Sequence, residues 1–384
     1  MSIDVLKEKI GNLQQNNRLV ILRSCGSDYQ NTLMRELTDG CNLVDLSLPN
    51  LRLQAEQNPQ LFADGLRLPA FLAGLQYAPF LLPALLNSGL PLGQILASCS
   101  QSYYLEELSA QGPYGSVSFM ELPMQAAGTA ERQPFVVQAD YLYSLTAAER
   151  RQIVTAMLGA EADYAAWVRR VLQQDIMERT TVSDSGKFYR FLCAVASMTG
   201  CVVNYTILAN NVGITAPTAK QWLQFLAGTG LVYLLQPVER VDGKRLVKAP
   251  KVYFRETGAA AYLLQLHEGA SLLQSVYFKN LYENYVVSAL REGYLRWGQE
   301  PDFHFYRDSN NKEITLILRT AGRLCPVNIC NGGFSVRRAQ KSFALLQDYA
   351  AGQGAALGSG CIIGIGGELQ QLDGETYYVP AEYV

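Results

Sequence analysis

Histidine is scarce in this chain of 384 residues, which contains only His267 and His304. The eight cysteines are scattered along the chain and form no C-x-x-C pair. Structural zinc sites and disulfide frameworks depend on closely spaced ligands, so neither is expected. Cysteines within apolar runs are typical of reduced thiols in a cytoplasmic protein. The composition therefore predicts no metal site.

Long apolar runs and a strong excess of one charge are also missing. No stretch of about 18 uncharged apolar residues occurs, which predicts that no helix spans a membrane. Residues 1–19 are amphipathic and charged, and they lack the apolar core of a signal peptide. The formal net charge of −2 argues against a generally basic nucleic-acid binder. Hydrophobic residues make up 49% of the chain, which predicts a folded protein of two or three domains.

Short apolar segments and helical segments alternate through the first third of the chain. The apolar segments predict strands at 19–23, 42–48, near 70, at 94–98 and at 116–122. Alternation of this kind is typical of an α/β fold in which helices cover both faces of a parallel sheet.

The segment Val20–Leu37 has the layout of a nucleotide-binding P-loop, which is a strand, a loop of small residues and a helix. A P-loop reads G-x-x-x-x-G-K-[ST], because glycines let the backbone approach phosphate, the lysine contacts phosphate and the hydroxyl binds Mg²⁺. Here Tyr29 stands at the second glycine, Gln30 at the lysine and Asn31 at the hydroxyl. The full set of candidate nucleotide-binding positions in this segment is Ser24, Gly26, Tyr29, Gln30, Asn31 and Thr32.

Two interpretations of this segment are open. An ordinary strand–turn–helix without a ligand is favoured, because the phosphate-binding residue types are missing. Binding of an anion by the backbone N–H groups at the helix N-terminus is the alternative.

The order of these segments resembles the prokaryotic AAA-type ATPases that carry a C-terminal domain of unknown function. In that family the Walker B strand ends in D-E-I-Q-x-x-P, and the tail Gln76–Pro79 follows this pattern. Thr32 and Leu33 match the end of the family's P-loop. The resemblance implies ATP hydrolysis, but Ala73 and Gly74 stand at the two Walker B acids. Neither residue can organise Mg²⁺ or an attacking water, so hydrolysis is not expected.

A second stretch resembles the C-terminal region of the same family. It reads NYTILANNVGITAPTAKQWLQFLAGTGLVYLLQP and is followed by KRLVKAPKVYF. The spacing predicts a helix–turn–helix with its turn at Gly213, followed by a hairpin of Leu231–Pro237 and Val241–Lys248. A helix–turn–helix followed by such a hairpin is a winged helix, which is therefore the predicted fold of this region. Its candidate DNA-binding residues are Thr215, Thr218, Lys220, Gln221, Lys244 and Arg245, and packing against another domain is the alternative role.

The last part of the chain resembles a restriction-endonuclease-like unit. The family patterns are F-E-N-x-V, F-Y-R-D-x-x-x-x-E-I-D-L-I and P-[IV]-E-[IV]-K. Glu283 keeps the helix glutamate, whereas Thr315 replaces the strand aspartate, and Asn328 and Cys330 replace the E and K of E-x-K. One carboxylate binds a hard divalent cation poorly, so nuclease activity is not expected.

Four regions are therefore predicted, namely a degenerate AAA-like domain at 1–125, a helical connection at 126–186, a winged-helix region at 187–274 and a degenerate nuclease-like α/β domain at 275–384. We expect a catalytically inactive ATPase-family protein that acts as a cytoplasmic binding or assembly module for a protein partner, without a cofactor and away from membranes. One alternative is an atypical ATPase that binds ATP and magnesium. Another is a DNA-binding regulator that works through the winged helix.

Overall fold

The computed structural model describes residues 3–24, 28–100, 105, 106, 108, 109, 117–124, 157, 164–172, 184–238, 246–331, 336–365 and 367–384. Within these residues the chain divides into two compact units. The first unit comprises Met1–Gln133, Gln221–Leu231 and Tyr294–Gln299, and the second comprises Pro134–Lys220, Val232–Gly293 and Glu300–Val384. Most of the helical connection predicted at 126–186 lies outside the described residues.

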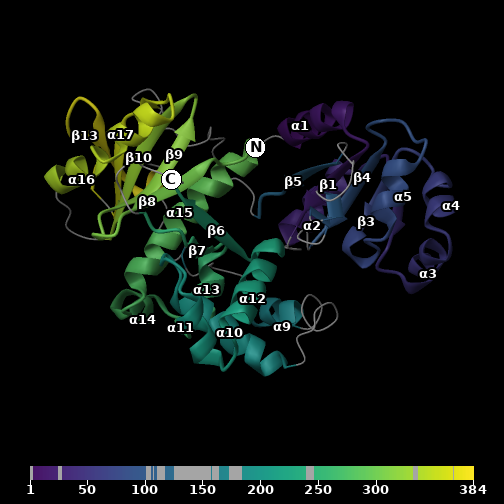
Figure 1. Ribbon diagram of the computed structural model, residues 1–384, viewed down its shortest axis with the longest axis horizontal. Coiled ribbons are helices and arrows are strands. Elements are labelled where there is room, and N and C mark those ends of the chain that lie inside the picture. The colour runs from purple at the N-terminus through teal and green to yellow at the C-terminus, as the bar shows by residue number, and fades with distance from the viewer. Residues whose placement is uncertain are drawn as a thin grey trace. The chain divides into compact units, whose positions relative to one another are not determined.

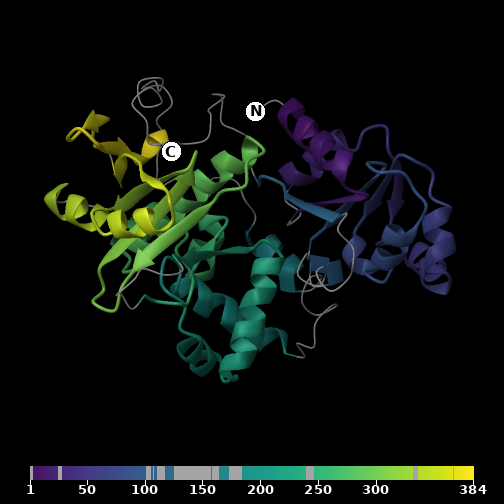
Figure 2. The same cartoon turned by 45° about the horizontal axis from the view of Figure 1, so that its top comes forward.

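A five-stranded parallel sheet forms the centre of the first unit (Figures 1 and 2). The strand order is β2-β3-β4-β1-β5, so β1 lies between β4 and β5. The elements are α1 (Ile3–Asn16), β1 (Leu19–Arg23), α2 (Asp28–Leu37), β2 (Asn42–Asp45), α3 (Pro49–Gln57), α4 (Pro59–Asp64), β3 (Ala70–Ala73), the 3-10 helix η1 (Leu75–Tyr77), α5 (Leu81–Asn87), β4 (Ile95–Cys99) and β5 (Val117–Glu121).

Helices cover both faces of this sheet because the buried strand residues alternate between two hydrophobic clusters. Leu19 and Ile21 of β1 pack in one cluster with residues of α3, α4 and α5. Val20 and Leu22 pack in the other cluster with residues of α1 and α2. The parallel sheet with helices on both faces, which the alternation of segments predicts, is confirmed.

The second unit contains a mixed nine-stranded sheet in the order β13-β14-β12-β10-β9-β8-β6-β7, with β11 paired to β10. Its helices are α9 (Tyr164–Arg170), α10 (Ser185–Ser197), α11 (Tyr205–Val212), α13 (Thr257–Leu263), α14 (Gly269–Gln274), α15 (Phe278–Arg296), α16 (Val336–Phe343), α17 (Leu346–Gly352) and the 3-10 helix η4 (Ala381–Tyr383), together with the start of α12 (Ala216–Gly228). Its strands are β6 (Val232–Pro237), β7 (Lys251–Phe254), β8 (Phe303–Arg307), β9 (Glu313–Thr320), β10 (Arg323–Cys330), β11 (Ala356–Leu357), β12 (Gly360–Gly364), β13 (Gln370–Gln371) and β14 (Thr376–Pro380).

The winged-helix prediction holds in its helices and fails in one strand. Gly213 ends α11 with a φ of 73°, a left-handed conformation that glycine adopts without strain. The predicted hairpin arm Val241–Lys248 is wrong in its described part, because β6 pairs instead with β7, further along the chain. β7 reads KVYF and is buried along its whole length, whereas the predicted arm contains no aromatic residue.

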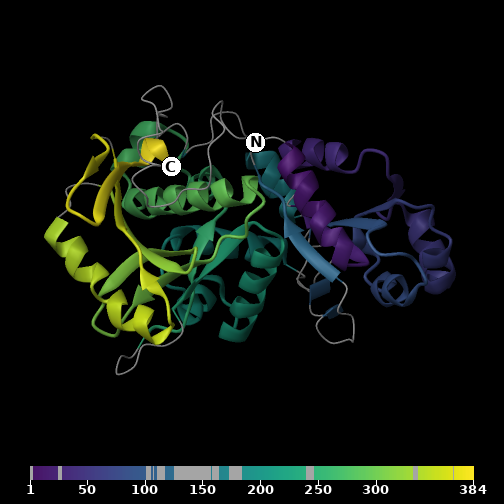
Figure 3. The same cartoon turned by 90° about the horizontal axis from the view of Figure 1, so that it is seen from above.

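β6 also connects the winged-helix region to the C-terminal strands. It pairs antiparallel with β7 on one side and parallel with β8 on the other. The regions predicted at 187–274 and 275–384 therefore share one sheet. In Figure 3 the long helix α15 (green) lies along this sheet, and its Glu283 and Asn284 hydrogen bond with residues of β7. In the parts of the chain listed above, no helix has the length and apolar character needed to cross a membrane.

Candidate functional site

The P-loop-like segment lies at the point of the first sheet where ligands bind in many open α/β folds. After β1 the chain goes to β2 at one edge, whereas after β4, which neighbours β1, it goes to β5 at the other edge. The carboxyl ends of two such strands form the crevice of a topological switch point. Ser24 directly follows β1 there, and its backbone N–H donates to the Cys99 carbonyl at the end of β4 (3.0 Å). The P-loop-like segment therefore lies at the carboxyl edge of the sheet, and its role as a site stays a prediction.

Gln30, at the lysine position of the P-loop, is fully buried. Its Nε2 donates to the backbone carbonyl of Leu122, just after β5, at 3.0 Å. Its Oε1 accepts a hydrogen bond from the Ser24 hydroxyl at 3.1 Å. The amide group thus ties the start of α2 to two neighbouring strand ends, and it makes structural hydrogen bonds where a nucleotide site needs a cation aimed at phosphate.

The second Walker B position, Gly74, has a backbone geometry that leaves no room for a carboxylate side chain. Gly74 follows β3 with a φ of 75°, and its N–H donates to the Ser98 hydroxyl at 3.0 Å. A Cβ atom at this glycine would lie 2.8 Å from Cδ2 of Tyr77. Any acidic residue here would therefore need both a strained backbone and a displaced Tyr77 ring. Next to it, Gln76 and Ser100 join β3 and β4 by two hydrogen bonds, of 3.0 and 3.3 Å.

The other predicted nucleotide-binding residues lie on α2, at the end of β3 or outside the described residues. Tyr29 packs against the hydrophobic cluster of α1 and α2, while Asn31 and Thr32 are exposed on α2. Ala73 ends β3 and accepts a backbone hydrogen bond from Leu46. Gly26 lies outside the described residues.

Two of the candidate DNA-binding residues, Thr215 and Thr218, take part in capping a helix. The Thr215 hydroxyl accepts from the Thr218 N–H at 3.3 Å and lies 2.8 Å from the Thr218 hydroxyl, so Thr215 caps the N-terminus of α12. Lys220 and Gln221 are exposed. Lys244 and Arg245 lie outside the part of the chain that the structure describes.

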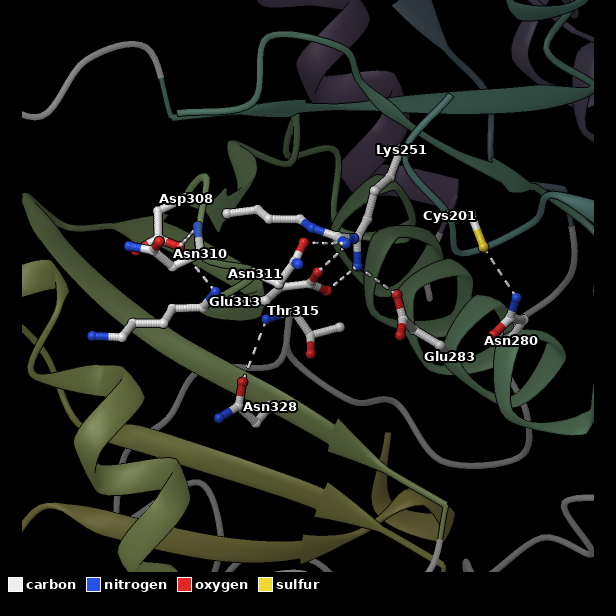
Figure 4. A network of polar contacts seen from close by, with 12 residues as sticks. Cys201, Lys251, Asn280, Glu283, Asp308, Asn310, Asn311, Glu313, Thr315 and Asn328 are labelled. Carbon is white, nitrogen blue, oxygen red and sulfur yellow. Dashed lines mark hydrogen bonds and ion pairs between the residues drawn. The ribbon is translucent and has the colours of Figure 1, made fainter. Parts of the chain in front are cut away.

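The nuclease-like positions come together in the second unit, as the pattern predicts. Glu283 of α15, Thr315 of β9 and Asn328 of β10 lie around one site (Figure 4). The Thr315 N–H donates to Asn328 Oδ1 at 3.4 Å, and Asn328 Nδ2 donates to the Ser342 hydroxyl at 2.8 Å. Among the described residues, no group of three or more histidine, cysteine, aspartate or glutamate side chains is placed to hold a metal ion.

The centre of this site is a lysine that the sequence alone does not single out. Lys251 starts β7, and its Nζ lies 2.9 Å from Glu283 Oε1 and 2.6 Å from Glu313 Oε1 (Figure 4). Arg307 reaches the other oxygen of Glu313 at 3.2 Å. The Tyr253 hydroxyl donates to Glu283 Oε1 at 2.8 Å. We call Lys251, Tyr253, Glu283, Arg307 and Glu313 the Lys251 network.

Burial and charge act in opposite directions on Lys251. Burial disfavours its charged form, but the carboxylates of Glu283 and Glu313 outweigh this effect and raise the pKa of Lys251 above its ordinary value. Burial and the adjacent Glu283 carboxylate also raise the pKa of Tyr253, well above the usual value for tyrosine. At neutral pH the site therefore contains a protonated lysine and a neutral tyrosine.

Asn284, which follows Glu283 on α15, makes two hydrogen bonds to the backbone of β7. Its Oδ1 accepts from the Phe254 N–H at 2.7 Å, and its Nδ2 donates to the Phe254 carbonyl at 2.9 Å. The hydroxyls of Thr199 and Thr257 complete its surroundings at 2.6 and 2.9 Å. Gly200 lies close by, and its hydrogen-only side chain leaves room for the Asn280 carbonyl, 3.3 Å from where a Cβ would be.

A signal for these residues was present in the quoted patterns. Lys251 and Tyr253 are the last K and the Y of the matching segment KRLVKAPKVYF, and Glu283 and Asn284 are the E and N of F-E-N-x-V. Arg307 and Glu313 are the R and the first E of F-Y-R-D-x-x-x-x-E-I-D. The chain departs from the nuclease patterns at Thr315, Asn328 and Cys330 but keeps Glu283, which belongs to the Lys251 network. The polar residues that match the family patterns could therefore have been considered as one group before the structure was known.

Comparison with known proteins places two families on this chain. A family described as "Domain of unknown function (DUF8612)" matches residues 153–269, and one described as "Domain of unknown function (DUF4143)" matches residues 278–384. Uncharacterized proteins of Mycobacterium tuberculosis and Mycobacterium bovis are each 24% identical over 165 residues, which is 42% of this chain. The chain spans 36% of the length of these relatives. The chain is thus similar to domains of unknown function over residues 153–269 and 278–384.

Proposed function

We propose that the chain is a binding or assembly module that uses an ATPase-like scaffold without hydrolysing ATP. The observation that carries the proposal is the buried side chain of Gln30. A phosphate-binding residue must aim its polar end into the crevice, whereas Gln30 uses its amide to join Ser24 and the Leu122 carbonyl. The closed geometry at Gly74 supports the same conclusion, because the second essential group of an ATPase has no room there.

Exposed leucines in the first unit support a protein as the partner. Leu43 of β2, Leu53 of α3 and Leu61 of α4 are 65%, 58% and 70% exposed. The three elements follow one another in the chain, and β2 is an edge strand with one unpaired side. Apolar side chains on an edge strand and its neighbours are typical of protein contacts rather than of DNA contacts.

Addition of MgATP is expected to leave the melting temperature of the protein unchanged within about 1 °C, even at ~5 mM nucleotide. The physical reason is that Gln30 and Gly74 occupy the positions of the phosphate-binding lysine and of a Walker B acid, while Arg23 at the end of β1 is paired with Glu106 and Glu121. Differential scanning fluorimetry with MgATP, MgADP and, as the control, sodium phosphate of equal ionic strength measures this. A saturable rise with MgATP that phosphate does not reproduce would establish the atypical ATP-binding alternative.

One feature of the winged helix favours DNA as a second candidate partner. The segment 204–238 contains no acidic residue and one lysine, Lys220, which is exposed near the start of α12. Phosphate would therefore meet no repulsion there, and Thr215 and Gln221 are exposed beside it.

If this surface binds DNA, the intact chain is expected to shift a duplex of about 30 base pairs at low salt. Each lysine or arginine that contacts phosphate contributes about one unit to the slope of affinity against salt, on logarithmic scales. Replacing Lys220, Lys244 and Arg245 with alanine is then expected to reduce that slope by up to about three units. Fluorescence anisotropy over a salt series measures it, with the exposed Lys7→Ala as the control, and no binding at ~20 mM salt removes this candidate.

A further inference from the structure

The ammonium group of Lys251 lies in an unusual position for a lysine. Its side chain is only 2% exposed, and its nitrogen contacts carboxylate oxygens from two elements, Glu283 of α15 and Glu313 of β9. The ring of Phe305 covers another side, with its centroid 5.5 Å from the nitrogen. Lysine is rarely buried to this extent unless it is paired, because its charge loses the solvation of water. The two carboxylates therefore surround a cation in a largely dry site.

The charges of the Lys251 network balance without any added ion. Glu283 and Glu313 contribute two negative charges, and Lys251 and Arg307 contribute two positive charges. A pair of carboxylates that shares one position is otherwise suited to a hard divalent ion such as Mg²⁺, Mn²⁺ or Ca²⁺. Here both carboxylates converge on the nitrogen of Lys251, and the position between them is filled by a group that belongs to the chain.

We propose that Lys251 is the built-in cation of a two-carboxylate site, and that its ammonium group takes the place of a divalent ion between Glu283 and Glu313. Because the cation is attached to β7, the same contact joins three elements, β7, α15 and β9, into one joint that needs no dissociable ion. The site then serves to hold the winged-helix hairpin on the C-terminal sheet. It also follows that removal of the lysine side chain converts the joint into one that binds a divalent ion. This inference does not depend on the proposed function of the first unit.

The full-length Lys251→Ala variant tests the proposal with Mn²⁺ alone as the probe. We expect the melting temperature of the native chain to be unchanged by ~1 mM Mn²⁺, whereas that of Lys251→Ala rises by roughly 5 °C when the ion is in hundredfold excess over its Kd. The double variant Lys251→Ala/Glu283→Gln is the control, and it should lose this rise because one carboxylate is gone. A rise of the same size in the native chain or in the double variant would overturn the proposal.

Refolding provides the readout if Lys251→Ala is too unstable to melt cooperatively. The variant is unfolded in urea and diluted with Mn²⁺ or with a chelator, and recovery is measured by near-UV circular dichroism. We expect several-fold greater recovery with Mn²⁺. The variant Lys251→Ala/Glu313→Gln should refold equally in both buffers. It keeps only the Glu283 carboxylate at this site, and one carboxylate binds Mn²⁺ too weakly to assist refolding. Equally poor recovery of Lys251→Ala in both buffers contradicts the proposal.

Discussion

The Glu283→Gln variant is expected to lose about 3–5 kcal/mol of unfolding free energy, because it removes one partner of a buried ion pair. Lys251 would keep its charge with only Glu313 to balance it, and the Tyr253 hydroxyl would face an amide in place of a carboxylate. The side chains of Lys251 and Glu283 are 2% and 10% exposed, so water can do little to compensate. Urea unfolding followed by far-UV circular dichroism measures the change.

The matched control for this variant is Glu268→Gln in the same unit. Glu268 is exposed and precedes α14 without a side-chain capping bond, so the same chemical change there should alter stability by less than about 0.5 kcal/mol. If Glu283→Gln and Glu268→Gln lost the same small amount, the Lys251 network would be only a surface ion pair in its energetic effect.

Replacement of Asn284 by leucine is expected to cost at least about 3 kcal/mol, since each buried polar group left without a partner costs about 1–3 kcal/mol. Leucine has a similar volume but cannot hydrogen bond, so the Phe254 N–H would lose its partner and the Phe254 carbonyl would keep only the Ser288 hydroxyl. The hydroxyls of Thr199 and Thr257 would lose theirs as well. Hydrogen exchange should show faster exchange at the Phe254 amide, and urea unfolding gives the loss of stability.

Asn210→Leu is the control for the asparagine variant. Asn210 is exposed on α11, and its replacement should change stability by no more than about 0.5 kcal/mol. A stable Asn284→Leu protein with an unchanged Phe254 amide would mean that the pairing with β6 and the Lys251 network suffice to hold β7. Such a result would remove Asn284 from the contacts that join α15 to the hairpin.

The two candidate sites of this chain differ in which residue types depart from the family patterns. At the crevice of the first sheet, the groups that would act on phosphate are replaced by residues that bond to the scaffold, as Gln30 does with the Leu122 carbonyl. In the second unit Thr315, Asn328 and Cys330 stand at three of the nuclease positions, whereas Glu283 is kept and pairs with Lys251. Both observations favour the proposal of a protein that keeps the packing of the resembling family without its catalytic groups. The MgATP experiment tests this at the crevice of the first sheet, and the Mn²⁺ experiment tests it at the Lys251 network.

Much of the local structure could be predicted from the sequence, because it depends on neighbouring residues. The period of apolar residues located the strands of the first sheet, and the alternation of Leu19 to Leu22 set the two faces that helices cover. Gly213 marked the turn of the helix–turn–helix. The second hairpin arm was misplaced because the segment Val241–Lys248 directly follows the first arm in the sequence, whereas pairing with β6 was decided by the residues of β7, which fit the pleated, buried position better.

The sequence by itself determined the element types, the parallel sheet and the absence of a phosphate-binding lysine at Gln30. Only the tertiary structure decided what the remaining polar groups do. Gln30 and Leu122 are 92 positions apart, and Lys251 and Glu313 are 62 positions apart. No local pattern relates such positions, because their contact arises when separate elements pack on a sheet and exclude water. A buried charge then needs a partner, and the fold determined that Lys251 meets two carboxylates.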